Sequence, residues 1–302
     1  MISKEIISDW FKELQDTICR SLEHVDGTGR FQTDNWDRPG GGGGITRIIT
    51  SGNIIEKGGV NFSAVWGKAP KTILHFLGLP EDTDTDFFAS GVSIVIHPFN
   101  PAIPIIHMNV RYFELSTGAW WFGGGMDLTP HYVSVDDAKY FHQQLKDVCD
   151  RHHPSYYDKF KKWADDYFFI KHRNETRGIG GVFFDYLKDD EGFTKASRFA
   201  FIKDIGSAFA PIYAELINRN SPTVYASREK KWQLLRRGRY VEFNLVWDRG
   251  TKFGLDTDGR TESILMSLPP QAEWVYQYDP EPGSKEAKTL SLLRKEIDWI
   301  NA

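Results

Sequence analysis

Two neighbouring segments with strict alternation, Gly91–His97 and Pro104–Leu115, limit the possible folds more than any other feature of the sequence. In both, apolar residues recur at every second position, which is typical of a β-strand with one buried face. The prolines between the segments force a turn, so we predict an antiparallel hairpin. One face of that hairpin carries Ser93, His97, His107, Asn109 and Arg111. This set indicates a functional site, although a polar sheet face that merely caps a core gives the same alternation.

The rest of the sequence divides into runs of strands and separate helices. Further strands are predicted over Thr46–Ile55, Val60–Trp66, Ala119–Gly123, Gly181–Leu187 and Arg239–Trp247. Apolar residues at helical spacing predict helices over Lys4–Val25, Asp136–Arg151, Tyr156–Phe169, Thr194–Arg219 and Ser284–Ile300. Because strands follow strands instead of alternating with helices, the order favours an α+β fold. We expect a mainly antiparallel sheet in a single domain that spans residues 1–302.

Composition argues against several classes of protein. The formal net charge is −4, so the overall field gives no reason to expect nucleic acid as a partner. Only Cys19 and Cys149 are present, which excludes a cysteine-based metal site and a disulfide scaffold and suits a reducing compartment. No apolar run is long enough for a transmembrane helix, and the charged N-terminal segment does not resemble a secretory signal. We therefore expect a cytoplasmic protein without a membrane span.

Two further segments combine glycine with acidic residues. Trp120–Asp127 contains three consecutive glycines, which let a backbone or a ligand approach closely, and it ends on Asp127. A bulge at a sheet edge is the alternative interpretation. The predicted strand Arg239–Trp247 is followed directly by Asp248 and Arg249. A carboxylate and a guanidinium at a strand end suit ligand binding, and they equally suit a local ion pair.

The run Gly40–Gly44 is the one low-complexity feature. Its spacing matches neither a P-loop nor a dinucleotide-binding motif. We interpret it either as a mobile loop before a strand or as the hinge of a flexible lid over a site.

Four histidines are candidates for a shared divalent metal site, since imidazole is a common metal ligand. They are His97, His107, His142 and His172. Their spacing matches no known metal motif, and histidines that are simply hydrogen-bonded are the alternative. Together with ten Trp and twenty-one Phe, these residues predict a cleft for a flat, largely apolar, anionic molecule.

Four long motifs resemble those of the oxygen-dependent coproporphyrinogen III oxidase family. The first combines Lys161–Trp163 with His172–Asp185, and the others are Ile106–Phe113, Trp120–Gly125 and Val241–Leu255. The similarity spans nearly the whole chain. It implies a flat antiparallel sheet with helices on both sides, and a homodimer whose contact involves the segment from Tyr240 to about Trp274.

The resemblance also implies an activity. Such an enzyme oxidatively decarboxylates two propionate groups of the tetrapyrrole coproporphyrinogen III to vinyl groups and gives protoporphyrinogen IX. It consumes O2 as co-substrate, releases CO2 and H2O2, and uses no organic cofactor.

The family's site residues carry over by position. Substrate contacts are implied for Ser93, Asn109, Val110, Arg111, Asp258, Gly259 and Arg260. His107 matches the family's proposed proton donor. The family's proposed metal ligands match His97, His107, His142 and His172, with manganese as the favoured metal. A metal-free mechanism is also proposed for the family.

The chemistry of the substrate adds two hypotheses. A porphyrinogen reacts with O2 directly once a pyrrole N–H is deprotonated or hydrogen-bonded to a carboxylate, and Asp248 or Asp127 is the expected carboxylate. Arg111, with Arg249 or Arg260, is expected to hold propionates, because bidentate geometry favours arginine.

Two other functions are alternatives to the metal-free oxidase. One is a metal-dependent oxygenase that uses manganese or iron at the four histidines. The other is a tetrapyrrole carrier without catalysis, and a carrier has no need of carboxylates that face pyrrole nitrogens.

Overall fold

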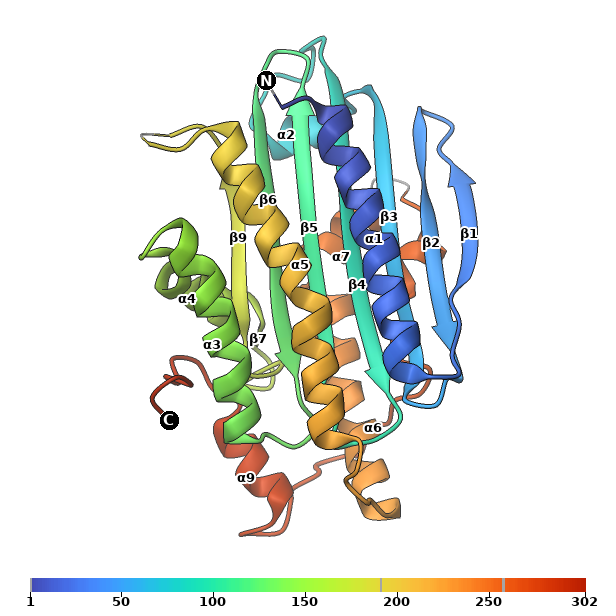
Figure 1. The fold of residues 1–302 in the computed structure, drawn as a ribbon, viewed down its shortest axis with the longest axis vertical. Helices are drawn as coiled ribbons and strands as arrows, with labels where there is room; N and C mark the ends of the chain where they lie inside the picture. The colour runs from blue at the N-terminus through green and yellow to red at the C-terminus, as the bar shows by residue number, and fades with distance from the viewer. Residues whose placement is uncertain (1, 191, 257–258) are drawn as a thin grey trace.

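The alternating segments form the centre of a seven-stranded antiparallel sheet in the computed structural model of the chain (Figure 1), which describes residues 2–190, 192–256 and 259–302. The strands, in spatial order, are β1 (Gln32–Asp37), β2 (Gly42–Thr50), β3 (Ile55–Lys68), β4 (Asp86–Pro98), β5 (Ile105–Leu115), β6 (Trp120–Thr129) and β9 (Gly181–Leu187). Two short strands, β7 (Phe169–Ile170) and β8 (Glu175–Thr176), form a separate pair. The predicted α+β fold with an antiparallel sheet is confirmed.

One face of the sheet, which we call the core face, carries the apolar half of each alternating strand. Val92, Ile94, Ile106 and Met108 are all buried there. The helices that cover it are α1 (Lys4–Asp26), α3 (Val135–His152), α4 (Tyr156–Tyr167) and α5 (Lys195–Asn220). Helix α1 starts where the Ser3 side chain accepts a hydrogen bond from the Ile6 backbone N–H. Its buried stripe then packs on β3 and β4.

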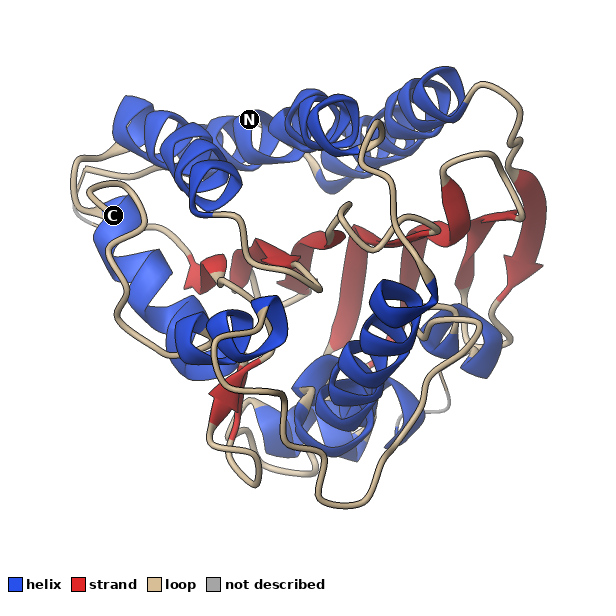
Figure 2. Ribbon diagram, turned by 90° about the horizontal axis from the view of Figure 1, so that it is seen from below, coloured by secondary structure: helices blue, strands red, loops and turns tan. Residues whose placement is uncertain are grey.

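The opposite face, which we call the site face, is covered by a second layer of helices (Figure 2). This layer contains α6 (Ser227–Glu242), the π-helical turn η1 (Phe243–Trp247), α7 (Arg249–Asp256) and α8 (Thr261–Leu265). Tyr240 of α6 packs against Val95 and Ile105 of the sheet. The Asn61 amide of β3 donates a hydrogen bond of 2.7 Å to the carbonyl of Ser263 in α8.

Two short helices complete the described chain. Helix α2 (Lys71–Phe76) contributes Ile73 to a small apolar cluster with Phe87 and Leu115. Helix α9 (Lys285–Leu292) lies near the C-terminus. It is shorter than the predicted helix Ser284–Ile300, because the chain turns after Leu292.

The predicted strand Arg239–Trp247 is wrong. Helix α6 continues to Glu242, and η1 follows without a break. The buried aromatic residues Trp232, Tyr240 and Phe243 instead lie on the inner side of a helical path. Packing of this side on the sheet overrides the local alternation.

The interpretations of Gly40–Gly44 as a mobile loop or a lid hinge are also wrong for most of the run. Gly42, Gly43 and Gly44 lie within β2 and pair with β3, and Gly43 and Gly44 also pair with β1. A Cβ atom at Gly44 would stand 2.4 Å from the ring of Trp36. Glycine at this position therefore makes room for an indole that crosses the strand.

Candidate active site

The strand register arranges the side chains of the site face in rows across β3 to β6. One row consists of Asn61, Ser93, Asn109 and Gly125, and the next consists of Ser63, Gly91, Arg111 and Gly123. We call these two rows the floor. Ser93 is exposed although β4 is the middle strand of the sheet. The helices of the second layer therefore leave the centre of the site face open, and the predicted hairpin with its shared polar face is confirmed.

Gly123 of the floor makes room for an ion pair. Arg111 Nη2 donates a hydrogen bond of 2.8 Å to Asp185 Oδ2. A Cβ atom at Gly123 would lie 2.4 Å from the other oxygen of Asp185 and 2.9 Å from Nε of Arg111. Any side chain at Gly123 would thus displace this pair.

A chain of hydrogen bonds leads from the buried interior toward the floor. Arg177 Nη1 donates to Asn244 Oδ1 at 2.8 Å. Its Nη2 lies 2.7 Å from both carboxylate oxygens of Asp127. His107 Nδ1 lies 2.7 Å from Asp127 Oδ1.

The chain continues across the floor to its exposed end. His107 Nε2 lies 3.5 Å from the Asn109 amide nitrogen. Arg111 Nη1 donates to Asn109 Oδ1 at 2.9 Å. Side-chain exposure rises along this path, from 3% at Arg177 and 2% at Asp127 to 17% at His107 and 39% at Arg111.

The buried end of the chain holds a fixed pair of charges. Burial opposes ionisation of Asp127, but Arg177 and His107 outweigh burial and hold the pKa of Asp127 below its ordinary value. The Arg177 guanidinium lies over the rings of Phe168 and Phe243, at 4.3 and 4.7 Å from their centroids.

This pair determines which ring nitrogen of His107 carries the hydrogen. A carboxylate only accepts hydrogen bonds, so His107 Nδ1 carries the hydrogen that points to Asp127. The Nε2 atom is left toward Asn109 and the floor. The arrangement of carboxylate, imidazole and open floor suits transfer of a proton to or from a bound molecule.

Asp248, at the start of α7, reaches the edge of the floor through Tyr167, whose ring stacks on Phe183, the β9 partner of Gly125. Its Oδ2 accepts from the backbone N–H and the hydroxyl of Thr251, at 2.7 and 2.8 Å. Its Oδ1 accepts from the Tyr167 hydroxyl at 2.8 Å. No lysine or arginine among the described residues lies within ion-pair distance of Asp248. The neighbouring Arg249 is exposed, with its guanidinium 6.0 Å from the Tyr167 ring.

A second arginine lies on the far side of the floor. Arg260, at the start of α8, is bonded to Asp34 of β1 and to the Ser263 hydroxyl, the latter at 3.2 Å. The Gly259 backbone N–H donates to the Gly254 carbonyl at 2.8 Å. Asp258 lies outside the described residues.

Val110 is not part of the floor. Its side chain lies on the core face and is 1% exposed within the apolar core. Strand alternation explains this placement, because Val110 stands between two site-face residues, Asn109 and Arg111. A side-chain contact between Val110 and a molecule on the floor is therefore excluded.

The four histidines do not come together, and the predicted shared metal site is not formed. His142 belongs to a helix on the core face, whereas His97 and His107 are on the site face. Its two ring nitrogens are 2.9 Å from the Tyr157 hydroxyl and 3.0 Å from the Ile179 carbonyl. Residues 2–190, 192–256 and 259–302 contain no group of three or more His, Cys, Asp or Glu side chains arranged to hold a metal ion.

The other two histidines each have protein partners as well. His97 is fully buried, with Nε2 2.9 Å from the Ser267 carbonyl. His172 Nε2 donates to Glu242 at 2.7 Å, and its Nδ1 accepts from the Trp247 indole at 3.0 Å. The four residues therefore do not fit a single metal ion.

Sequence reasoning missed Arg177, Asp185 and Tyr167, which hold three of the predicted residues in place. Arg177 and Asp185 fall inside the motif His172–Asp185, so the motif marked their neighbourhood. Their partners are 50 and 74 residues away along the chain, and no local pattern pairs residues at such distances.

Comparisons with known proteins agree on one family. A family model described as coproporphyrinogen III oxidase matches residues 6–299. The oxygen-dependent coproporphyrinogen-III oxidase of Drosophila melanogaster is 50% identical over 95% of this chain and 76% of its own length. The protein of that name from Synechococcus sp. (strain CC9902) is 48% identical over 95% of this chain and 85% of its own length.

Within the described part of the chain, no helix is both long and apolar enough to cross a membrane.

Proposed function

The chain belongs to the coproporphyrinogen III oxidase family, and we propose that it carries out the family's reaction on the floor of the site face. The reaction is the oxidative decarboxylation of two propionates of coproporphyrinogen III to vinyl groups, which gives protoporphyrinogen IX in haem biosynthesis. For each propionate, one O2 takes up two electrons and two protons to become H2O2, and one CO2 leaves.

The observation that carries the proposal is the open floor between two arginines. Arg111 projects from β5, and Arg260 lies over β1 and β2. Neighbouring strands are about 4.8 Å apart, so β2 and β5 are separated by about 14 Å. A flat macrocycle with propionates on opposite sides fits such a spacing, and each guanidinium can hold one carboxylate by two hydrogen bonds. Ser93 and Asn109 lie between the arginines.

We assign the proton transfer to His107. Its Nδ1–H is fixed on Asp127, so its Nε2 is directed toward the ring or the propionate of a bound substrate. Asp127 is buried and both of its oxygens are held by cationic or imidazole donors. It therefore orients His107 and does not itself contact substrate.

Asp248 is the better of the two candidates for hydrogen bonding to a pyrrole N–H. It is partly exposed, and its carboxylate is held by neutral donors from Tyr167 and Thr251. Its negative charge is thus not neutralised by an adjacent cation, whereas that of Asp127 is neutralised by Arg177. A carboxylate on the N–H raises electron density on the pyrrole, which favours attack on O2. Arg249 beside it is a third candidate for a propionate.

The mechanism assigns no metal to His97, His107, His142 and His172, because their geometry does not fit one. Their roles here are acid–base chemistry at His107 and hydrogen bonding at the other three.

We also propose that the chain forms a homodimer through residues 240–274. Large apolar side chains are exposed along this segment at Leu245, Val246, Phe253, Leu255 and Trp274. Exposed apolar residues gathered on one segment are typical of an interface.

We further propose that the protein acts in the cytoplasm. Cys19 and Cys149 are both free and buried, which suits a reducing compartment.

A bulky substitution on the floor tests where the substrate binds. Ser93→Phe places a ring at the exposed centre of the floor, and we expect loss of substrate binding and of O2 uptake with coproporphyrinogen III. Thr33→Phe, on the exposed edge strand β1, is the matched control and should leave both unchanged. If Ser93→Phe binds and converts the substrate like the unaltered protein, the site lies elsewhere.

A further inference from the structure

The π-helical turn η1 (Phe243–Trp247) connects two parts of the proposed site. Asn244 within the turn holds Arg177, and Asp248 directly after the turn caps α7. Five-residue π-helical turns are rare and occur mostly at functional sites. The Asp248 backbone N–H donates to the Phe243 carbonyl at 2.9 Å, and contacts with residues outside the turn add to this bond.

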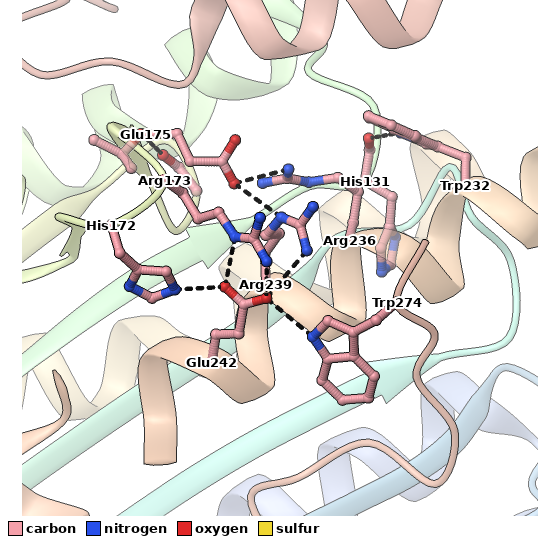
Figure 3. A network of polar contacts seen from close by, with 11 residues as sticks. His131, His172, Arg173, Glu175, Trp232, Arg236, Arg239, Glu242 and Trp274 are labelled. Carbon is pink, nitrogen blue, oxygen red and sulfur yellow. Dashed lines mark hydrogen bonds and ion pairs between the residues drawn. The ribbon is translucent and has the colours of Figure 1, made fainter. Parts of the chain in front are cut away.

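Such contacts converge on Glu242, the residue before the turn (Figure 3). Its Oε2 accepts from His172 Nε2 at 2.7 Å and from Arg173 Nε at 2.8 Å. Its Oε1 accepts from Arg173 Nη2 at 2.7 Å, Trp274 Nε1 at 2.9 Å and Arg239 Nη1 at 3.1 Å. Burial opposes ionisation of Glu242, but Arg173 and His172 outweigh it and lower the pKa of Glu242 to about 2. The carboxylate is a fixed anchor for the groups around it.

His172 extends from this anchor to the last residue of the turn. Its Nδ1 accepts a hydrogen bond of 3.0 Å from the indole N–H of Trp247. The two rings are stacked, with centroids 6.0 Å apart and an interplanar angle of 22°. His172 is therefore bonded at one nitrogen to the residue that precedes η1 and at the other to the residue that ends it. Both nitrogens are in use, one as donor and one as acceptor.

We propose that His172, anchored on Glu242, stabilises η1 in its π-helical form and so positions Asn244 and Asp248 for the reaction. The hydrogen bonds of His172 go to Glu242 and Trp247, so it acts through these neighbours and is a positioning residue. This positioning role rests on the proposed function only where it is tested by enzyme activity. It replaces the metal-ligand role that family resemblance implies for this histidine.

Two substitutions separate hydrogen bonding from ring packing. His172→Gln retains one donor for Glu242 and one acceptor for Trp247, although it lacks the ring. His172→Phe retains a ring for stacking on Trp247, although it lacks both hydrogen-bonding atoms. We expect His172→Gln to keep kcat within about threefold of the unaltered protein. We expect His172→Phe to lower kcat by about tenfold or more with little change in KM, because misplaced groups slow the chemical step while Arg111 still binds substrate.

A second readout does not depend on activity. Backbone hydrogen exchange in peptides covering residues 243–256 should be faster in His172→Phe and unchanged in His172→Gln. Trp247→Phe removes the indole donor and should reproduce the His172→Phe result in both readouts. His24→Phe is the control, since His24 is exposed in the last turn of α1, on the opposite face of the sheet. It should change neither readout.

The competing role as a metal ligand predicts a different pattern. A ligand role requires that His172→Gln and His172→Phe lose activity equally, lose bound manganese equally, and recover with added Mn2+. That pattern would contradict the positioning role of His172. Unchanged backbone hydrogen exchange in His172→Phe would contradict it as well. Failure of the proposed function looks different again: Ser93→Phe would then leave turnover intact, whatever His172→Phe does.

Discussion

Asp127 Oδ1 lies 2.7 Å from His107 Nδ1, at the point where the buried part of the site meets the open floor. Asp127 is in turn held by Arg177, whose guanidinium is enclosed by aromatic rings. The folded chain thus fixes which nitrogen of His107 carries its hydrogen before any substrate binds. Preorganisation of this kind reduces the reorganisation required during reaction.

Replacing Asp127 tests this relationship. In Asp127→Asn the amide no longer selects one tautomer of His107, and we expect kcat to fall by about 100-fold or more with KM nearly unchanged. The same change leaves Arg177 buried without its anion, which costs about 3–5 kcal/mol of stability. His107→Gln retains the Asp127–Arg177 pair and is therefore the second variant. Steady-state O2 uptake measures both, and normal kcat in both variants contradicts the assigned proton transfer.

Gly123→Ala should weaken substrate binding. The added methyl group occupies the space between Arg111 and Asp185, so it displaces the guanidinium that we propose holds a propionate. We expect KM to rise about tenfold, which corresponds to about 1.4 kcal/mol of lost binding, with a smaller effect on kcat. Gly40→Ala is the control, because Gly40 is exposed in the turn before β2 and the atoms nearest to its new methyl belong to the far end of the Arg38 side chain. An unchanged KM in Gly123→Ala would remove Arg111 from the binding site.

The carboxylate of Asp26 makes stability depend on pH in a defined direction. Burial opposes its ionisation, but backbone N–H groups of Ile55, Asn53 and Ile54 outweigh burial and lower the pKa of Asp26. A lowered pKa means that the folded state favours the ionised form. Its stabilisation is complete above the ordinary pKa of an aspartate and is lost as pH falls through the lowered pKa.

We therefore expect Asp26→Asn to be less stable than the unaltered protein by about 1–3 kcal/mol at neutral pH. The difference should shrink as the solution is acidified below about pH 4. Urea unfolding at several pH values measures it. A difference that stays constant from neutral to acidic pH contradicts a role for the ionised carboxylate.

The proposed dimer surface predicts the effect of added charge. Leu245→Asp combined with Val246→Asp places two carboxylates on side chains that are each 45% exposed in the single chain. We expect this variant to sediment as a monomer and the unaltered protein as a dimer. Ile6→Asp, at a side chain 54% exposed on α1, should remain dimeric. If all three proteins sediment alike, residues 240–274 do not form the contact.

Local alternation predicted the polar hairpin well because its determinants are local. Ser93, Asn109 and Arg111 share a face through strand periodicity alone, and the prolines between the strands fix the turn. The burial of Val110 follows from the same periodicity. The resemblance to the family suggested a contact for Val110, but a side chain on the core face has no access to the floor.

Features that depend on distant partners were not predictable in this way. The partners of Arg177 come from β6 and η1, which no single motif contains. The strand expected at Arg239–Trp247 is helical because its aromatic residues pack on the sheet, and its local pattern gives no sign of that surface. The four histidines looked alike in sequence, and only their hydrogen-bond partners distinguish one that faces the floor from three that hold structure together.

The most direct test of the account is turnover by Asp248→Asn. Asparagine caps helices as well as aspartate does, so α7 and its neighbours should stay in place while the negative charge is removed. Substrate binding, O2 uptake and vinyl formation with coproporphyrinogen III are measured on the same preparation. We expect normal binding and a kcat lower by about 100-fold or more, as for other losses of a preorganised charge. Turnover close to that of the unaltered protein would show that no carboxylate at Asp248 is needed, and would contradict the proposed mechanism.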